Sequence, residues 1–275
     1  MSAGFFAGLS LDVPRILGII NVTPDSFSDG SEAFAVDDAV RQGRAMIVAG
    51  ADVLDVGGES TRPGAQPVTV EEEISRIKPV VQALAGEGFT VSIDTRHALV
   101  MAAAIEAGAS IVNDVTALTG DPDSLALASD SGLPVILMHM QGEPGTMQDN
   151  PQYDDAALEV FRYLKERVQI CEAAGVKRDR IAVDPGIGFG KTLDHNLDIL
   201  ARLDIYRDLG CPVVLGASRK SFIGKISRGE AAKDRVSGSL AAVLNALAKG
   251  VRLFRVHDVA ETRQALAVWQ AIEKN

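Results

Sequence analysis

The chain has 275 residues, of which 47% are hydrophobic and 5% aromatic, so it can form one large domain or two small ones with an aliphatic core. Its formal net charge of −10 argues against nucleic acid and membranes as partners, and no apolar run approaches the length of a membrane span. The start lacks a signal-peptide pattern and two cysteines are too few for a disulfide framework, so we expect a cytoplasmic protein.

In chain order, short apolar runs rich in β-branched residues recur eight times. Their nearly continuous apolar character predicts parallel strands that are covered on both faces. Helical patterns lie between them, and the one that starts at Val70 has Thr69 as its expected N-cap. The predicted strands cover residues 16–20, 53–56, 91–93, 110–112, 135–138, 181–183, 213–215 and 253–256, and the predicted helices 36–49, 70–84, 97–106, 153–174, 236–248 and 258–272.

This alternation of strands and helices predicts a single (β/α)8 barrel, the TIM-barrel fold, over residues 1–275. A doubly wound open sheet is the alternative. The count of eight strands and the lack of any break in composition favour the barrel. Residues 1–14 form a short lead-in that could cover the bottom of the barrel.

A polar segment with the sequence NVTPDSFSDG follows the first predicted strand, from Asn21 to Gly30. Such a segment cannot extend a sheet, and the loop after a first strand is where α/β enzymes place chemistry. Its oxygen atoms suit a hard cation, whereas Phe27 is an aromatic residue that a solvated turn does not need. A plain polar turn is the better interpretation of any single residue, but not of the whole segment.

Polar residues also stand at or just after the end of each of the remaining predicted strands. Capping of the next helix would explain any one of them, such as Asp94 or Asp184, but not the whole series. Asp94, Asn113 and Asp184 would lie beside one another at the carboxyl end of the barrel. Together they offer hydrogen-bond acceptors to a neutral, flat heterocycle that is rich in donors.

A second group is cationic and could hold a phosphate or pyrophosphate: Arg255, His257, Lys220 and Arg62. Asn21 and an aspartate of its loop could hold Mg2+ against that anion. We expect Asn21 to face Arg255 and His257 across the end of the barrel. Arg219 is interpreted as a solvated surface charge.

The glycine-rich segment 186–192 looks like a phosphate-binding loop but does not match either common pattern. Pro185 stands where the Walker pattern needs glycine, and Lys191 stands where the dinucleotide pattern needs it. We expect these glycines to let the backbone approach a ligand, with Phe189 at the wall of its site. The four histidines lack the spacing of zinc ligands.

These motifs closely resemble those of the dihydropteroate synthase family of folate biosynthesis, over nearly the whole chain. The resemblance implies a pterin-binding barrel and a transferase that joins 6-hydroxymethyl-7,8-dihydropterin pyrophosphate to p-aminobenzoate, giving 7,8-dihydropteroate and pyrophosphate. It also implies ionisation of the pterin C–O bond before the amine attacks, Mg2+ as cofactor, a homodimer, and a target of sulfonamides. The matching segments are residues 21–30, 57–64, 92–96, 111–115, 184–191, 217–221 and 255–259.

The resemblance implies roles for individual residues. Those implied to bind the pterin diphosphate are Thr61, Asp94, Asn113, Asp184, Lys220, Arg255 and His257. Those implied to line the p-aminobenzoate site are Phe27, Arg62, Pro63, Phe189 and Ser221. The implied metal ligand is Asn21, with Asp25 or Asp29 beside it. The residues expected to carry catalysis are Asp184, Lys220, Asn21, Arg255 and His257.

Two other functions are compatible with a pterin-binding barrel. A methyltransferase that passes a methyl group to a corrinoid protein would not need Arg255 and His257 or the loop at residues 60–63. A non-catalytic protein that only binds pterin would be expected to lose one of the loop motifs. Both motifs are present, so we prefer the synthase.

Overall fold

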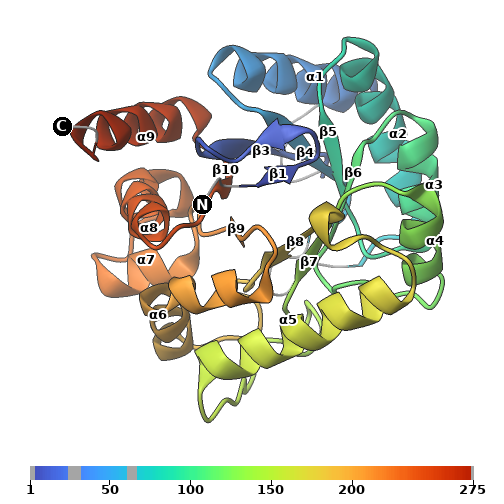
Figure 1. Ribbon diagram of the computed structural model, residues 1–275. Helices are drawn as coiled ribbons and strands as arrows, with labels where there is room; N and C mark the ends of the chain where they lie inside the picture. The colour runs from blue at the N-terminus through green and yellow to red at the C-terminus, as the bar shows by residue number, and fades with distance from the viewer. Residues whose placement is uncertain (1–3, 24–31, 61–66, 274–275) are drawn as a thin grey trace.

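Eight parallel strands form one sheet in the computed structural model, which describes residues 4–23, 32–60 and 67–273 (Figure 1). The order of the strands is β8-β7-β6-β5-β4-β3-β10-β9. A bridge between Val183 and Val213 joins the two edges, so the sheet closes and the predicted (β/α)8 barrel is confirmed. The strands are β3 (Arg15–Asn21), β4 (Val53–Gly57), β5 (Val91–Asp94), β6 (Ile111–Asp114), β7 (Val135–Met138), β8 (Ile181–Asp184), β9 (Val214–Leu215) and β10 (Leu253–Val256).

Each predicted strand coincides with an observed one, and the differences lie at the ends. Asn21, Asp94 and Asp184 are the last residues of their strands, because the ladder of backbone hydrogen bonds continues through a residue whatever its side chain. The polar residues therefore belong to the rigid sheet and not to the loops that follow.

The helices form a layer around the barrel, as Figure 1 shows. The six predicted helices are present, and Thr69 caps α2 as expected, since its hydroxyl accepts a hydrogen bond from the Glu72 N–H at 3.2 Å. Three helices of six to nine residues, α4, α6 and α7, escaped prediction because so few residues show no clear helical period. The helices are α1 (Glu32–Val48), α2 (Val70–Gly86), α3 (Ala98–Glu106), α4 (Ser124–Ser131), α5 (Ala156–Ala173), α6 (Leu193–Ala201), α7 (Ser221–Ile226), α8 (Val236–Ala248) and α9 (Val259–Glu273), and the 3-10 turns are η2 (Arg178–Arg180), η3 (Leu203–Leu209) and η4 (Ala232–Asp234).

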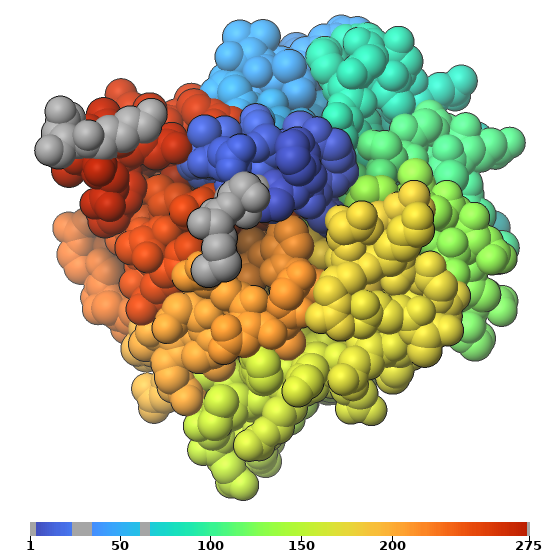
Figure 2. Space-filling model, in the orientation of Figure 1, coloured from blue at the N-terminus to red at the C-terminus, as the bar shows by residue number. Residues whose placement is uncertain are grey.

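The lead-in before β3 covers the amino-terminal end of the barrel. It contains a two-stranded antiparallel hairpin of β1 (Phe5–Phe6) and β2 (Leu9–Ser10). Figure 2 shows the N-terminal residues, in dark blue, near the centre of this face. Their apolar side chains pack with residues from the first halves of seven strands in a separate cluster of Phe6, Leu11, Leu17, Val53, Ile111, Ile136, Ala182, Val214 and Leu253.

The larger core lies between the sheet and the helices. Cys171 and Cys211 are both buried there as free thiols. In the described part of the chain, every helix is too short or too polar to cross a bilayer. Because apolar clusters fill the amino-terminal end of the barrel and the layer under the helices, polar groups are concentrated at the carboxyl end of the barrel.

Candidate active site

Arg255 lies at the centre of the polar groups inside the carboxyl end of the barrel. Its Nε is 2.5 Å from Asp55 Oδ2 and its Nη2 is 2.5 Å from Asp94 Oδ2. Asn113 donates from Nδ2 to the same carboxylate of Asp55 at 3.2 Å. These side chains come from β10, β4, β5 and β6. Because β3 separates β10 from β4, the contacts run through the interior of the barrel.

Burial disfavours the charged forms of the residues in this network, whereas the ion pairs between them favour the charged forms. Burial disfavours the charged guanidinium, but Asp55 and Asp94 outweigh it and raise the pKa of Arg255 further. Burial also raises the pKa of Asp94 to about 7, although Arg255 opposes that rise. Arg255 is therefore a permanent cation, and Asp94 can take up a proton near neutral pH.

This arrangement corrects the expectation of separate acceptor and cation groups. Arg255 was placed with the cations that hold a phosphate, yet its guanidinium lies between two carboxylates, one of them from the acceptor group. An arginine side chain is long enough to reach across the barrel interior, and a buried charge needs a partner there. An anion bound near Arg255 would share it with Asp55 and Asp94.

Asp184 ends β8 and is almost fully buried. Its Oδ1 accepts a hydrogen bond from the Gly186 N–H at 2.7 Å. Burial raises the pKa of Asp184, whereas this hydrogen bond and the charge of Lys220 lower it. The next helix, α6, is capped by Thr192, so Asp184 does not serve as a helix cap.

Lys220 and Phe189 lie against each other at the neighbouring strand ends. The Lys220 ammonium is 4.0 Å from the centre of the Phe189 ring, within the range of a cation–π interaction. Phe189 packs in a small apolar cluster with Met138 and Met147, and Ser221 follows Lys220 as the first residue of α7. The implied pterin group Lys220 and the implied p-aminobenzoate wall are thus adjacent.

His257 is neutral in this environment. Burial lowers its pKa to about 3, and the nearby charge of Arg255 adds to the effect. The Ser218 hydroxyl lies 3.0 Å from His257 Nδ1 and accepts from the His257 backbone N–H at 3.2 Å. If that hydroxyl donates to Nδ1, Nε2 carries the proton and is a neutral hydrogen-bond donor. His257 therefore offers an N–H and not a positive charge.

Asn21 is the only residue of the predicted metal site that can be placed, since the other calls at the first two loops fall outside the described residues. It ends β3, which pairs directly with both β4 and β10. Asn21 consequently lies beside the strand of Arg255 and His257, and the expectation that it faces them across the barrel is wrong. The residues outside the described part are Asp25, Phe27, Asp29, Thr61, Arg62 and Pro63.

The sequence argument misjudged or missed three further residues near the site. Arg219 is not a free surface charge, because it pairs with Asp258 at 2.5 Å and its side chain is only 32% exposed. Asp55 and Ser218 stand near strand ends but had no role in the sequence-based prediction, although they hold Arg255 and His257. The signal for Asp55 was a lone carboxylate within an apolar strand.

A second acidic cluster lies beside the loop after β4. Ligand atoms of Glu59, Glu73 and His97 come within 4.8 Å of one another. Both Glu73 oxygens are buried, and burial raises the pKa of Glu73 to about 7, although Thr95 and the charge of Arg96 oppose that rise. Glu59 already pairs with Arg96 through both carboxylate oxygens, at 3.1 and 3.3 Å. We assign no metal to this cluster, because Arg96 supplies the compensating charge.

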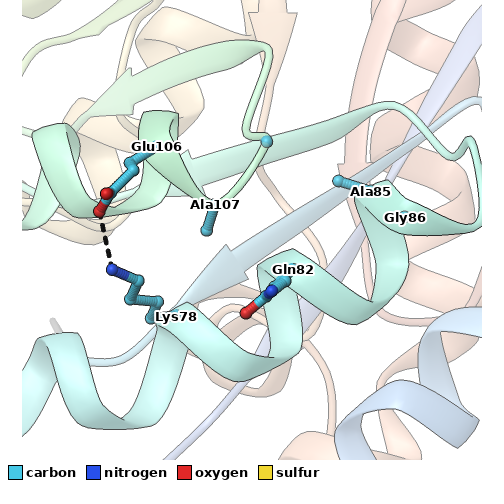
Figure 3. A pocket seen from close by; sticks show the side chains of 7 residues that line it. Lys78, Gln82, Ala85, Gly86, Glu106 and Ala107 are labelled. Atoms are coloured by element: carbon cyan, nitrogen blue, oxygen red, sulfur yellow. Dashed lines mark hydrogen bonds and ion pairs between the residues drawn. The ribbon is translucent and has the colours of Figure 1, made fainter.

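A surface hollow of about 600 Å3 lies between α2 and α3, and Figure 3 shows it from close by. Lys78 and Glu106 form an ion pair at its rim, at 2.7 Å. Both side chains are well exposed, so the pair contributes little. The hollow is lined from the last turns of the two helices, at the opposite end of the barrel from the charged network, and we assign it no role.

Comparison with known proteins identifies the family of the chain. A family model described as pterin binding enzyme matches residues 17–257. The chain is 48% identical over 271 residues to the dihydropteroate synthase of Escherichia coli (strain K12), covering 97% of this chain and 95% of that protein. The structure of Xanthomonas albilineans dihydropteroate synthase with 4-aminobenzoic acid matches with a TM-score of 0.92, at 48% identity and 99% coverage of both chains. The same enzyme in complex with 7,8-dihydropteroate matches with a TM-score of 0.88, at 45% identity, over 96% of this chain and 95% of that chain.

Proposed function

The chain belongs to the pterin binding enzyme family, and from that membership we propose how its strand-end residues carry out the reaction of its relatives. It is a transferase that catalyses the dihydropteroate synthase reaction. The methylene of 6-hydroxymethyl-7,8-dihydropterin pyrophosphate forms a C–N bond with p-aminobenzoate, and pyrophosphate leaves. The observation that carries the assignment of residues is the buried network around Arg255, in which acceptors and a fixed cation lie side by side.

The pterin ring is the donor-rich heterocycle that these acceptors fit. Its amino and ring N–H groups would donate to Asp184 and to Asn113 or Asp94, which the sheet holds in fixed positions. A buried carboxylate beside the ring also favours positive charge on it. The charge of Lys220 lowers the pKa of Asp184, and its ammonium lies over the Phe189 ring. Lys220 would therefore lie where the pterin ring meets the second substrate.

The leaving group needs donors and positive charge. Arg255 supplies a permanent cation, and His257 supplies an N–H held in orientation by Ser218. Asn21 offers one amide oxygen, a ligand type that Mg2+ accepts when most of its other ligands are water and phosphate oxygens. Bound there with the substrate, Mg2+ would neutralise charge on the departing pyrophosphate.

We propose that the C–O bond ionises before the amine attacks. The electron pair of that bond leaves with pyrophosphate, and the electron-rich pterin shares the positive charge of the methylene. The arylamine then supplies its lone pair and loses a proton. Phe189, with Ser221 beside it, would form the wall that orients the amine and excludes water from the cation.

A direct assay tests this function. Pyrophosphate release is expected only when both the dihydropterin pyrophosphate and p-aminobenzoate are present, with 7,8-dihydropteroate formed in equal amount. Release without p-aminobenzoate would indicate hydrolysis, and no release with both substrates would reject the proposal. The same assay separates the synthase from a methyltransferase and from a protein that only binds pterin.

We further propose that the chain acts as a homodimer in the cytoplasm. A groove of about 550 Å3 between α6, α7 and α8 has Leu197 and Ile226 exposed at its edge, which suits a second copy. The two free cysteines suit a reducing compartment. Sedimentation of the purified chain as a monomer at micromolar concentration would contradict the dimer.

A further inference from the structure

The loop after β8 is fixed by side-chain hydrogen bonds to four successive carbonyl groups. Most loop carbonyls bond to water or to the backbone, so a series of this kind marks a segment whose position is strongly determined. The donors come from the segment before α5, from the loop itself and from α6. They are Gln148 Nε2 to the Gly188 carbonyl at 2.6 Å, Lys191 Nζ to that of Phe189 at 2.9 Å, the Tyr153 hydroxyl to that of Gly190 at 2.9 Å, and Asn196 Nδ2 to that of Lys191 at 3.3 Å.

The backbone of this loop is pressed against the segment that follows β7. Gly186 and Gly190 have φ values of 69° and 60°, in the left-handed region. A Cβ atom would lie 1.9 Å from the His139 carbonyl oxygen at Gly186, and 2.3 Å from the Gln141 carbonyl oxygen at Gly190. Only glycine allows this approach. Where this approach buries carbonyl groups, as at the bonds made by Lys191, they need donors from the protein.

Lys191 supplies the donors at the point where the two segments meet. Its side chain is 3% exposed, and its Nζ lies 2.9 Å from the Phe189 carbonyl, 3.3 Å from the His139 carbonyl and 2.9 Å from His139 Nδ1. Burial lowers the pKa of His139 to about 2, so its ring is neutral and Nδ1 can accept. The ring is itself held edge-on by Tyr163, with centroids 4.8 Å apart. An amine with three converging acceptors serves better here than an apolar side chain.

We infer that Lys191 is a positioning residue that fixes Phe189 for the arylamine substrate. Lys191 holds the carbonyl of residue 189, and the ring on the same residue lies under the Lys220 ammonium at 4.0 Å. Lys191 itself is buried, with its ammonium bonded to the loop carbonyls and to His139, so it would act on the substrate through Phe189. This inference rests on the proposed function, in which Phe189 forms the wall of the p-aminobenzoate site.

The effect of Lys191 should fall on one substrate and not on the other. The groups proposed for the pterin, such as Asp184 and Asn113, belong to the strands of the sheet and keep their positions when the loop moves. The charge of Lys191 also lowers the pKa of Asp184, but less than the charges of Lys220 and Arg255 do. Phe189 lies beyond the end of β8 and depends on the loop bonds for its position. Displacing a substrate wall by about 1 Å can cost up to about a hundredfold in catalysis.

The test compares Lys191→Met with Lys165→Met, a matched change at an exposed lysine on α5. We expect the Lys191 variant to raise KM for p-aminobenzoate roughly tenfold and KM for the pterin substrate less than twofold, with the control unchanged. Equal changes in both KM values would show a purely structural role and overturn the inference. An unchanged KM for p-aminobenzoate would overturn it as well.

Two further measurements keep the test decisive. Fluorine NMR of 4-fluorophenylalanine at position 189 reports the ring without any turnover: we expect one sharp resonance in the parent chain and a shifted or broadened one in Lys191→Met. An unchanged resonance rejects the inference even if the parent proves inactive, whereas inactivity of the parent rejects the proposed function. If Lys191→Met does not fold, Gln148→Ala removes an exposed donor from the neighbouring carbonyl and should raise KM for p-aminobenzoate roughly threefold, in the same selective way.

Discussion

The two ends of the barrel interior are built from the same strands but from opposite kinds of residue. At the amino-terminal end, Val53, Ala182 and Leu253 join the apolar cluster under the N-terminal hairpin. Two residues further along the same strands stand Asp55, Asp184 and Arg255. Side chains of a strand point to the same face at every second residue, so these pairs form successive layers inside the barrel, roughly 7 Å apart.

The difference between these layers separates stability from chemistry. The apolar layer is sealed by Phe6 and Leu11 and needs only shape and volume. The charged layer faces the loops and buries ions at a cost in solvation, which a packed apolar core of the same size would avoid. This solvation cost is expected where a substrate must bind to fixed charges. Four tests examine the difference between the two layers.

The largest effect is expected from the charged layer, through Asp184→Ala. Removing the carboxylate proposed to favour positive charge on the pterin should lower kcat/KM about a thousandfold. The thermal midpoint should change little, because burial already disfavours the ionised form of this group. Steady-state kinetics and calorimetry measure the two effects, with Asp179→Ala as an exposed control. Lys220→Ala should behave similarly, and near-normal turnover in either variant would undo the role given to that residue.

Arg255→Met should reduce both activity and stability. It leaves Asp55 and Asp94 buried without their cation, which is expected to cost about 3 kcal/mol in the free energy of unfolding at pH 8. At pH 5 Asp94, whose pKa burial already raises to about 7, can take up a proton, so the loss should be smaller. Urea unfolding at the two pH values measures this. An equal loss at both would mean that packing, and not charge, is what Arg255 contributes.

The fold could be predicted largely from the sequence because strand periodicity and β-branched composition are local signals. The eight apolar runs defined the barrel even where β9 has only two ladder residues. The short helices α6 and α7 could not be predicted in this way. They form because the barrel offers a surface on which residues such as Ile199 and Phe222 are buried.

The candidate site could be predicted only as a set of strand-end residues and not as a network. Asp94 and Asn113 were expected as neighbours and are paired across β5 and β6, since parallel strands place their carboxyl ends together. The pairing of Arg255 with Asp55 could not be predicted, because 200 residues separate them and closure of the barrel alone brings them together. The misjudgement of Arg219 has the same origin, since its partner Asp258 lies on another strand end.

Glu73→Gln examines a buried carboxyl group at this end whose charge is disfavoured by burial. The pKa of Glu73 is raised from 4.5 to about 7 by burial, so the folded state holds a proton that the unfolded state has lost above pH 4.5. The free energy of unfolding should therefore fall as pH rises from about 4.5 to 7, by no more than about 3 kcal/mol. Glutamine cannot titrate, so the variant should gain stability relative to the parent over this range. A constant difference between the two chains from pH 5 to pH 8 would show that Glu73 has an unrecognised cationic partner.

Phe6→Ala tests the apolar layer and should affect stability alone. Phe6 is 2% exposed and seals the cluster beneath Leu17 and Leu253, so its loss should cost about 2 kcal/mol in the free energy of unfolding. Phe5 lies beside it but is 66% exposed, and Phe5→Ala is the matched control with little expected change. Both variants should keep kcat/KM within twofold of the parent, as measured on folded protein. If Phe6→Ala lowered kcat/KM tenfold while still folded, the two layers would be coupled through the strands, because loosening one end would then move Asp55, Asp184 and Arg255 at the other.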